Sequence, residues 1–342
     1  MMVKAGLKWM FLIIGTTIGA GYASGRELWQ FFGQESVFAI ALFTILFILS
    51  IYVMMSIGYK MKTTHYTPIL EQLVGEKIAA IYDGMIFVYL FSTTVIMIAG
   101  GGAALEAVKI PYWHGIFLMS TVLVLLFIWG NKGLVSINIV IIPLLIILLL
   151  AVLLKFGHHV EGIWKIDIYH QSNWTSAIIF TSLNILSLAA ILGGIGSEIK
   201  TKGEILFASI GSGVVLGVVS FFYNQSLIQV AGDIMVYEIP LFALLKNYPY
   251  AMTIIMTVLL LFAIYTTAAS GLFGLITRLK KIIKLPYWGL AALLVITMIP
   301  LTTLGFAKLV TILYPLYGLI NLYILAALVI YPIVQKQQRK ID

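Results

Sequence analysis

The chain has 342 residues, of which 61% are hydrophobic and only 10% are charged. Soluble domains carry about 25% charged residues, so this composition excludes a water-soluble fold. At about 20 apolar residues per bilayer crossing, the length allows about ten membrane spans and leaves no room for a soluble domain. The absence of cysteine excludes disulfides, thiolate metal ligands and a cysteine nucleophile.

Apolar runs long enough to cross a bilayer follow one another along the chain, separated by turns with proline, glycine and charged residues. They comprise residues 5–33, 36–59, 78–107, 112–130, 133–154, 174–199, 204–231, 249–277, 286–304 and 309–334. The stretch from Ile234 to Leu245 is too short to span, contains Pro240 and is predicted to be an external hairpin or surface helix. The sequence therefore predicts an all-α integral membrane protein of about ten transmembrane helices.

Lysine and arginine residues give the orientation of these spans. If the N-terminus is inside and the spans alternate, the inner segments hold 15 of the 21 Lys and Arg residues and the outer segments hold 5, with Arg26 inside the first span. Such an excess in the inner loops is typical of cytoplasmic loops. We predict a multi-pass protein of a bacterial-type inner membrane with both termini in the cytoplasm. Because the basic residues are scattered single anchors, no nucleic-acid partner is expected.

The first span reads Gly15-Thr16-Thr17-Ile18-Gly19-Ala20-Gly21-Tyr22-Ala23-Ser24-Gly25-Arg26-Glu27. Each glycine weakens a helix by about 1 kcal/mol relative to alanine, and a charge at mid-bilayer costs at least about 2.5 kcal/mol. Close packing against a neighbouring helix would explain the glycines but not Arg26 and Glu27. Irregular backbone at membrane depth survives only inside protein or beside water. We predict that this helix is unwound near Gly19 to Gly21 and lines a polar cavity.

The sixth span has a similar sequence between Ser187 and Glu198, with glycines at positions 193, 194 and 196. We predict a second break between Ala189 and Gly196. Two interrupted helices, five helices apart and entering from opposite sides, mark the binding site of transporters built from inverted repeats. The ends of the half-helices can offer N–H groups to a carboxylate and free carbonyls to a cation.

The string Ile18-Gly19-Ala20-Gly21 resembles the Ile-Gly-x-Gly signature in the first helix of the amino acid–polyamine–organocation superfamily. The longer string from Gly15 to Phe32 is similar to the YkvI group of amino acid permeases within it. This resemblance implies the leucine-transporter fold, with inverted five-helix repeats at 1–155 and 156–342 forming one membrane domain. It also implies alternating access around a central site for a small amino-acid-like solute. Oligomeric state stays open.

The residues predicted to bind this small-molecule substrate lie at the two breaks. They are Gly19, Ala20, Gly21, Tyr22, Asn184, Ser187, Ala189 and Ala190. A substrate carboxylate is expected against the N–H groups of Ala20 to Tyr22, and an amine against carbonyls around Ser187 to Ala190. A β-branched residue at Gly21 is expected to strain the backbone and to clash.

The resemblance further implies a coupling-ion site, the only cofactor expected. Sodium-coupled members combine two carbonyls at the first break with an Ala-x-x-Ser/Thr-Ser/Thr pattern in helix eight, and here the candidates are Gly15, Ile18, Ala263, Thr266 and Thr267. Alternatively, these threonines bond their own i−4 carbonyls, or Ser270 sets another register. Proton coupling through a lysine of the fifth helix is the rival. Lys132 lies at the start of that span, where it also suits a positive-inside anchor.

The remaining polar residues allow several roles. Arg26 must have an anionic or carbonyl partner; an external gate with Glu106 is predicted, with Glu27 and a substrate carboxylate as alternatives. Asp83 and Glu198, at the inner ends of spans three and six, belong either to an inner gate or to the interface. The loop that follows span five holds His158, His159, Glu161, Asp167 and His170, but their spacing fits no metal-ligand pattern.

Two other classes of function are less consistent with the sequence. An intramembrane enzyme needs a nucleophile–base pair, paired aspartates or a metal motif such as His-Glu-x-x-His, and the spans contain none of these. A channel is expected to carry a repeated filter loop, whereas two interrupted helices favour a carrier.

Overall fold

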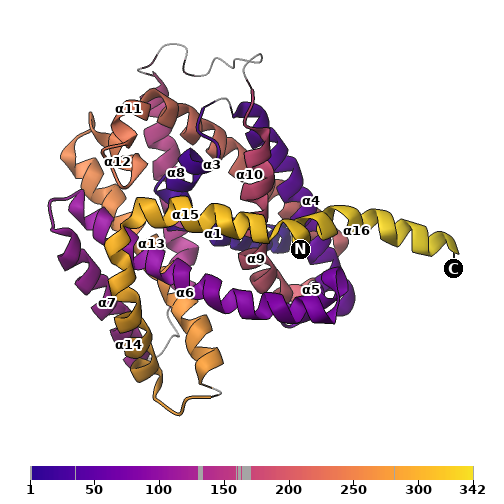
Figure 1. Ribbon diagram of the computed structural model, residues 1–342. Helices are drawn as coiled ribbons and strands as arrows, with labels where there is room; N and C mark the ends of the chain where they lie inside the picture. The colour runs from indigo at the N-terminus through magenta and orange to yellow at the C-terminus, as the bar shows by residue number, and fades with distance from the viewer. Residues whose placement is uncertain are drawn as a thin grey trace.

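The computed structural model describes residues 2–34, 36–129, 134–158, 160, 163, 171–280 and 282–341, and these form helices joined by turns with no strand among them (Figure 1). The helices are α1 Met2–Thr17, α2 Ala20–Ala23, α3 Arg26–Phe31, α4 Val37–Met61, α5 Thr67–Val74, α6 Glu76–Glu106, α7 Tyr112–Trp129, α8 Leu134–His158, α9 Trp174–Ile195, η1 Gly196–Glu198, α10 Lys202–Gln229, α11 Ala231–Ile234, α12 Pro240–Leu245, α13 Tyr250–Leu279, α14 Tyr287–Met298, η2 Ile299–Leu304, α15 Phe306–Ile320 and α16 Leu322–Ile341.

Most of the predicted spans coincide with long apolar helices. Within the described residues, six helices are long and apolar enough to cross a membrane, and the pair α15 and α16, bent by 40°, makes up to seven. The shorter apolar helices α7 and α8 occupy the predicted fourth and fifth spans. The first predicted span is divided among α1, α2 and α3. The prediction of an all-α multi-pass membrane protein is therefore confirmed.

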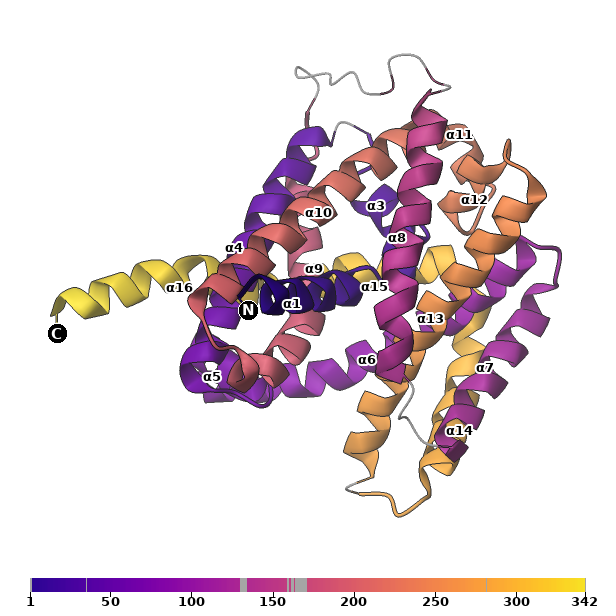
Figure 2. The same ribbon diagram turned by 180° about the vertical axis from the view of Figure 1, so that it is seen from behind.

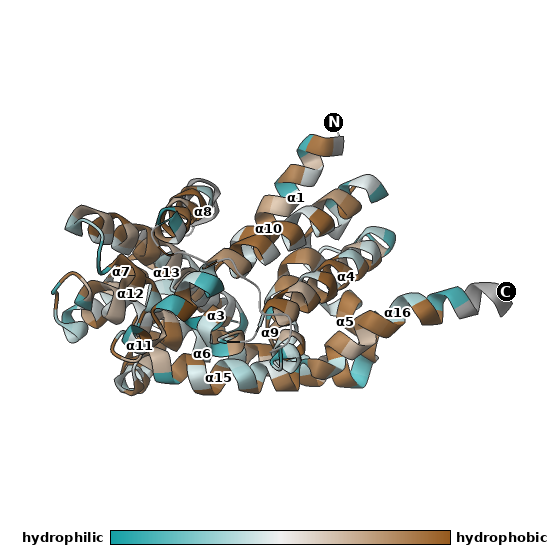
Figure 3. Cartoon of the chain, turned by 90° about the horizontal axis from the view of Figure 1, so that it is seen from above, coloured by the Kyte–Doolittle hydropathy of each residue, from teal (hydrophilic) through white to brown (hydrophobic). Residues whose placement is uncertain are grey.

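Hydrophobic residues predominate along the helices (Figure 3). Ile45, Phe117, Ile147 and Ile296 each expose more than half of their surface although they lie in the middle of apolar helices. In water, so many exposed aliphatic and aromatic side chains would be unfavourable, because each leaves apolar area unburied. In a bilayer they face lipid, while the backbone polar groups are paired inside each helix.

The contacts between helix ends show which ends lie on the same side of the bundle, and these agree with the predicted alternation of the spans. At one end of the bundle, Lys8 pairs with Glu198 and Arg278 with Asp83. At the other end, Asn173 donates to the Phe32 carbonyl, Asn224 to the Gly33 carbonyl, and the Tyr112 hydroxyl to the Thr302 carbonyl. Each contact joins segments that the predicted alternation places on one side. Which side faces the cytoplasm stays a prediction from the Lys and Arg distribution.

The predicted break in the sixth span is wrong. Helix α9 runs unbroken to Ile195 and continues as a 3-10 turn, so Ala189 to Ile195 are helical. The glycines serve close packing instead: a Cβ on Gly193 would lie 2.4 Å from the Cα of Tyr66, and one on Gly196 would lie 2.5 Å from the carbonyl oxygen of Gly58. Small residues here let the end of α9 approach the backbone that follows α4.

The segment from Ile234 to Leu245, predicted to be an external hairpin or surface helix, is exposed at Met235 and Val236 (86% and 80%) and buried in its second half. All six residues of α12 are buried, and the Leu241 N–H donates to the carbonyl of Ser24 at 3.0 Å. The segment is too short to span. Its second half, α12, packs beside the first span because its apolar side chains are removed from solvent there.

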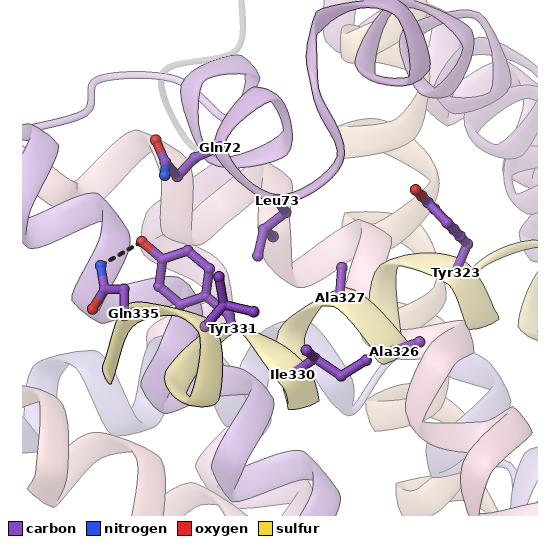
Figure 4. Close-up of a pocket in the computed structure, with 9 residues that line it drawn as sticks. Gln72, Leu73, Tyr323, Ala326, Ala327, Ile330, Tyr331 and Gln335 are labelled. Atoms are coloured by element: carbon purple, nitrogen blue, oxygen red, sulfur yellow. Dashed lines mark hydrogen bonds between the residues drawn. The ribbon is translucent and has the colours of Figure 1, made fainter. Parts of the chain in front are cut away.

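The tenth span is bent rather than straight. Asn321, with ψ near zero (−1°), ends α15 and separates it from α16, which extends away from the bundle towards the C-terminus (Figure 2). An open pocket of 380 Å³ lies between α16 and α5 (Figure 4). It is lined by Gln72, Leu73, Tyr323, Ala326, Ala327, Ile330, Tyr331, Val334 and Gln335. None of these residues belongs to the predicted binding site.

The packing of α9 gives a testable pair of variants. Gly193→Ala places a methyl group against the backbone of Tyr66, which cannot move aside as a side chain could, so we expect a loss of about 1–3 kcal/mol in the free energy of unfolding. Its neighbour is the control: a Cβ on Gly194 meets only the Thr64 carbonyl at 4.0 Å. Thermal unfolding of the purified protein, followed by tryptophan fluorescence, measures both. Equal melting temperatures for the two variants would contradict the close-packing role.

Candidate functional site

The predicted break in the first span is confirmed at Ile18 and Gly19. Helix α1 ends at Thr17, Gly19 is extended (φ −84°, ψ −172°), and α2 starts at Ala20. The Gly19 N–H turns back to the Thr17 carbonyl at 2.9 Å, so it leaves the regular i→i−4 pattern. The chain therefore crosses this point without a continuous hydrogen-bond ladder.

The break leaves backbone groups of both kinds unpaired. Among the described residues, the carbonyls of Gly15, Thr16 and Ile18 accept no hydrogen bond, and the N–H groups of Ala20, Gly21 and Tyr22 donate none. Unpaired backbone groups are costly away from water. The N–H groups predicted to bind an anion and the carbonyls predicted to bind a cation are thus both unpaired, within a stretch of eight residues.

Most of the segment around the break is buried, but Gly15, Thr16 and Gly19 are partly exposed. Ile18, Ala20 and Tyr22 are fully buried and Ala23 is 1% exposed. The Tyr22 hydroxyl contacts the Ser220 hydroxyl at 2.8 Å and donates to the Leu216 carbonyl. Tyr22 therefore fastens α2 to α10 through its side chain.

A second irregularity follows at Gly25. Its φ of +79° is left-handed, and a Cβ there would lie 2.8 Å from the Tyr223 hydroxyl oxygen, so a side chain would add both backbone strain and a clash. That hydroxyl donates to the Ala23 carbonyl at 3.0 Å. Sequence reasoning missed Tyr223, although the polar run Tyr223-Asn224-Gln225-Ser226 within an apolar span was a signal for it.

At Gly21 the expected clash is present but the expected backbone strain is not. The φ of Gly21 is not positive, so any residue could adopt its backbone conformation. A Cβ would instead lie 2.0 Å from Oε1 of Glu27. The small residue leaves room for a carboxyl group.

The predicted residues of the sixth span use their polar groups within their own helix. Asn184 donates to the Phe180 carbonyl at 2.8 Å, and the Ser187 hydroxyl to the Asn184 carbonyl at 3.0 Å. Because α9 is unbroken there, the carbonyls of Ser187 to Ala190 belong to its hydrogen-bond ladder. The structure therefore offers no unpaired carbonyl for a substrate amine there, Ala189 and Ala190 supply only small apolar surface, and binding of an amine at these residues stays a prediction.

The proposed ion ligands of α13 lie next to the break. A Cβ on Gly19 would lie 3.8 Å from the Thr267 hydroxyl oxygen. Thr266 and Thr267 both donate to the Ala263 carbonyl, at 3.1 and 2.8 Å, as threonines in membrane helices commonly do. Each hydroxyl oxygen keeps lone pairs for a cation. Ser270 donates to the Thr266 carbonyl at 2.8 Å.

Arg26 does not pair with Glu106, which is exposed at the end of α6. Its guanidinium donates to the carbonyls of Tyr237 and Glu238, the latter at 2.9 and 3.1 Å from two nitrogens. The turn before α12 offers carbonyls that a planar group with several donors can bind together. The requirement for a partner was predicted correctly, but the predicted partner was wrong.

Glu238 extends this contact to a third element. Its carboxylate accepts from the Ala307 N–H at 2.6 Å, at the start of α15. The chain of contacts from Arg26 through Glu238 to Ala307 therefore joins α3, the segment before α12, and the tenth span at one end of the break.

The opposite end is held by other ion pairs. Lys8 lies 3.0 Å from Glu198, and both side chains are more than half exposed. Asp83 contacts Arg278 at 2.8 Å and accepts from the Tyr66 hydroxyl. Burial, together with the bond to Asp83, raises the pKa of Tyr66 to about 12, so this hydroxyl stays protonated and can donate.

Several predicted residues fall outside the described part of the chain. They are Lys132, His159, Glu161, Asp167 and His170. Lysine-based proton coupling and the absence of a metal in that loop therefore remain expectations from sequence.

Comparison with known proteins gives the family. No family model matches the chain. It is 50% identical over 336 residues to the uncharacterized protein YyaD of Bacillus subtilis (strain 168), covering 98% of this chain and 99% of YyaD. The chain belongs to the YyaD family. The uncharacterized membrane protein YkvI of the same bacterium is 24% identical over 331 residues, with 93% of each chain covered, in line with the resemblance to the YkvI group.

Solved structures show the fold of this YyaD relative. Mhp1 in an inward-facing conformation superposes with a TM-score of 0.59 at 14% identity, covering 95% of this chain and 75% of Mhp1. A Na⁺-coupled sialic acid symporter superposes with a TM-score of 0.54 at 12% identity, covering 96% and 86%. The chain therefore has the fold of these secondary transporters, with its inverted repeat. The repeat boundary between residues 155 and 156 stays a prediction.

The Arg26 contact gives a prediction about access to the break. The chain has no cysteine, so Ser24→Cys, at a position 1% exposed, provides a single thiol beside it. Adding Arg26→Ala removes charge-assisted hydrogen bonds worth about 1.5–3 kcal/mol, and we expect labelling of the purified protein by a polar maleimide to accelerate at least about tenfold.

The control for this experiment breaks an exposed ion pair at the same end of the bundle. Lys246 contacts Asp233 at 3.2 Å, with the side chains 54% and 42% exposed, so Lys246→Ala should leave the labelling rate unchanged. Equal labelling rates with Arg26→Ala and Lys246→Ala would show that Arg26 does not hold this end closed.

Proposed function

We propose that this protein is a secondary active transporter that carries a small amino-acid-like solute by alternating access. The observation that carries the proposal is the break at Ile18 and Gly19, with unpaired N–H and carbonyl groups in the described part of the chain. Irregular backbone at membrane depth marks a cavity or a binding site. The likeness to Mhp1 and to a sodium-coupled symporter supports a carrier and not an enzyme.

The substrate carboxylate binds the N–H groups of Ala20, Gly21 and Tyr22. These groups have no other partner among the described residues, and Ala20 and Gly21 have little or no side chain to obstruct a ligand. Backbone N–H groups at a helix start favour an anion. A small solute can approach these groups because Gly19 beside them is partly exposed and has no side chain.

A sodium ion binds at the other face of the break, through the carbonyls of Gly15, Ile18 and Ala263 and the hydroxyls of Thr266 and Thr267. Five oxygen ligands suit a hard cation. The support is the proximity of Gly19 to Thr267 together with the unpaired carbonyls of Gly15 and Ile18. An ion between α1 and α13 would link the mobile break to a long, well-packed helix.

The protein works in a cytoplasmic (inner) membrane of bacterial type, with both termini in the cytoplasm. The support is the excess of lysine and arginine in the segments that this orientation places inside. The ion pairs of Lys8 with Glu198 and Arg278 with Asp83 then lie on the cytoplasmic side. The contact of Arg26 with Glu238 lies on the outer side.

A ligand screen followed by transport tests this proposal. Purified protein is heated with each of the twenty amino acids, in sodium or in potassium buffer, and compounds that raise the melting temperature are then supplied radiolabelled to proteoliposomes. We expect accumulation driven by an inward sodium gradient. Accumulation driven equally by a proton gradient in potassium buffer would favour the proton-coupled alternative, and no accumulation of any amino acid would contradict the proposal.

The ion site gives a second, residue-level prediction. Thr267→Ala removes one oxygen ligand while α13 stays helical, so half-maximal uptake should need at least about tenfold more sodium, equivalent to about 1.4 kcal/mol of binding energy. Thr257→Ala is the matched control, since Thr257 is buried on the same helix and bonds only the Thr253 carbonyl. If both variants keep the sodium dependence of the unmodified protein, the ion is bound elsewhere.

A further inference from the structure

Glu27 is a buried acid that the proposed transport mechanism does not yet use. It lies in the first turn of α3, is 7% exposed, and has no hydrogen bond or ion pair with any described residue. A buried carboxylate without a partner is strongly unfavourable. An ionisable side chain within a membrane span commonly marks a substrate or ion pathway.

The side chain of Glu27 points back to the break. Its Oε1 would lie 2.0 Å, and its carboxyl carbon 2.7 Å, from a Cβ built on Gly21, so the carboxyl group lies directly against the backbone of α2. Tyr89 and Tyr314 lie close enough to interact with it electrostatically. The Tyr89 hydroxyl also faces Ser187, so the acid lies between the first and sixth spans.

The cation next in sequence does not neutralise this acid. The guanidinium of Arg26 is turned to the carbonyls of Tyr237 and Glu238, and the carboxylate of Glu238 is the one that acts on it. Arg26 and Glu27 are consecutive residues of α3, so their side chains leave the helix in different directions and reach different neighbours. Glu27 therefore retains an unsatisfied preference for a positive group.

We propose that Glu27 binds the cationic nitrogen of the transported solute. The inference rests on the proposed function and narrows its substrate class to small solutes with a protonated amine. It also assigns the amine a partner, because the carbonyls of Ser187 to Ala190 are bonded within the unbroken α9. A carboxylate on the N–H groups of α2 and an ammonium on Glu27 then bind the two ends of one amino acid.

The test uses compounds matched in shape but differing in charge. L-alanine, L-leucine and L-phenylalanine are each compared with the acid that lacks the amine (propionate, 4-methylpentanoate, 3-phenylpropionate). They are also compared with the amine that lacks the carboxylate (ethylamine, 3-methylbutylamine, 2-phenylethylamine). Thermal shifts of the full-length protein give the affinity of each compound. In at least one set, the amino acid should bind at least tenfold more tightly than its deaminated acid.

Substitution of the acid provides the second arm. Glu27→Gln keeps the shape and removes the charge, so the affinity for the amino acid should fall at least tenfold, towards that of the deaminated acid. Glu27→Asp should retain part of the affinity. Glu106→Gln, at an exposed position near the end of α6, is the control and should leave it unchanged. If Glu27→Gln does not fold, the proposal is tested by the affinities of the unmodified protein for the amino acid, its deaminated acid and its decarboxylated amine.

Two results would overturn the inference. One is equal affinity for an amino acid and its deaminated acid in all three sets, including the case where none binds. The other is undiminished affinity in Glu27→Gln. If proteoliposomes still accumulate a labelled amino acid in either case, the transporter proposal stands and only the role of Glu27 fails. If no amino acid is accumulated, the transporter proposal fails as well.

Discussion

The structure depends on one constraint: backbone polar groups that leave a helix at membrane depth must be satisfied by protein or face a water-filled cavity. The first span leaves its helix at Ile18 and Gly19, and its surroundings respond to this. Tyr22 and Tyr223 tie the short helix α2 to α10, and Leu241 of the buried α12 donates to Ser24. These contacts satisfy the part of the chain that follows the break. Among the described residues, they leave the N–H and carbonyl groups at the break itself unpaired.

The length of the apolar runs was sufficient to predict where the helices lie, because each bilayer crossing needs about 20 apolar residues whatever the fold. The break in the first span was also predictable, because glycines occur there together with Arg26 and Glu27. The same glycine pattern in the sixth span was misleading. Gly193 and Gly196 lack a side chain because a neighbouring backbone occupies that space, and close packing and unwinding leave the same signal in a sequence.

Partners that are backbone atoms were the least predictable part of the site. Arg26 binds the carbonyls of Tyr237 and Glu238, and every residue of the chain offers such an acceptor, so side-chain identity gave no reason to choose this turn over Glu106. The burial of α12 was equally hidden, since its apolar residues suit a surface helix at the membrane or a packed one. Glu27 was considered as a sign of the break and as a partner for Arg26, but not as a group that contacts α2; its return to Gly21 follows from the left-handed turn at Gly25.

The two ends of the break are closed by contacts of different kinds. At one end, the exposed pair of Lys8 and Glu198 contributes about 0.2–1 kcal/mol at most, since water competes for both charges. At the other, the partly buried guanidinium of Arg26 donates to two carbonyls, and such charge-assisted bonds contribute about 1.5–3 kcal/mol each. The Lys8 end is also held by Arg278, which donates to the carboxylate and the carbonyl of Asp83 at 2.8 and 2.7 Å, so opening at either end breaks charge-assisted hydrogen bonds. A solute that supplies both a carboxylate and an ammonium to the break would compensate part of that cost, because its charges would bind groups that the closed chain leaves unpaired.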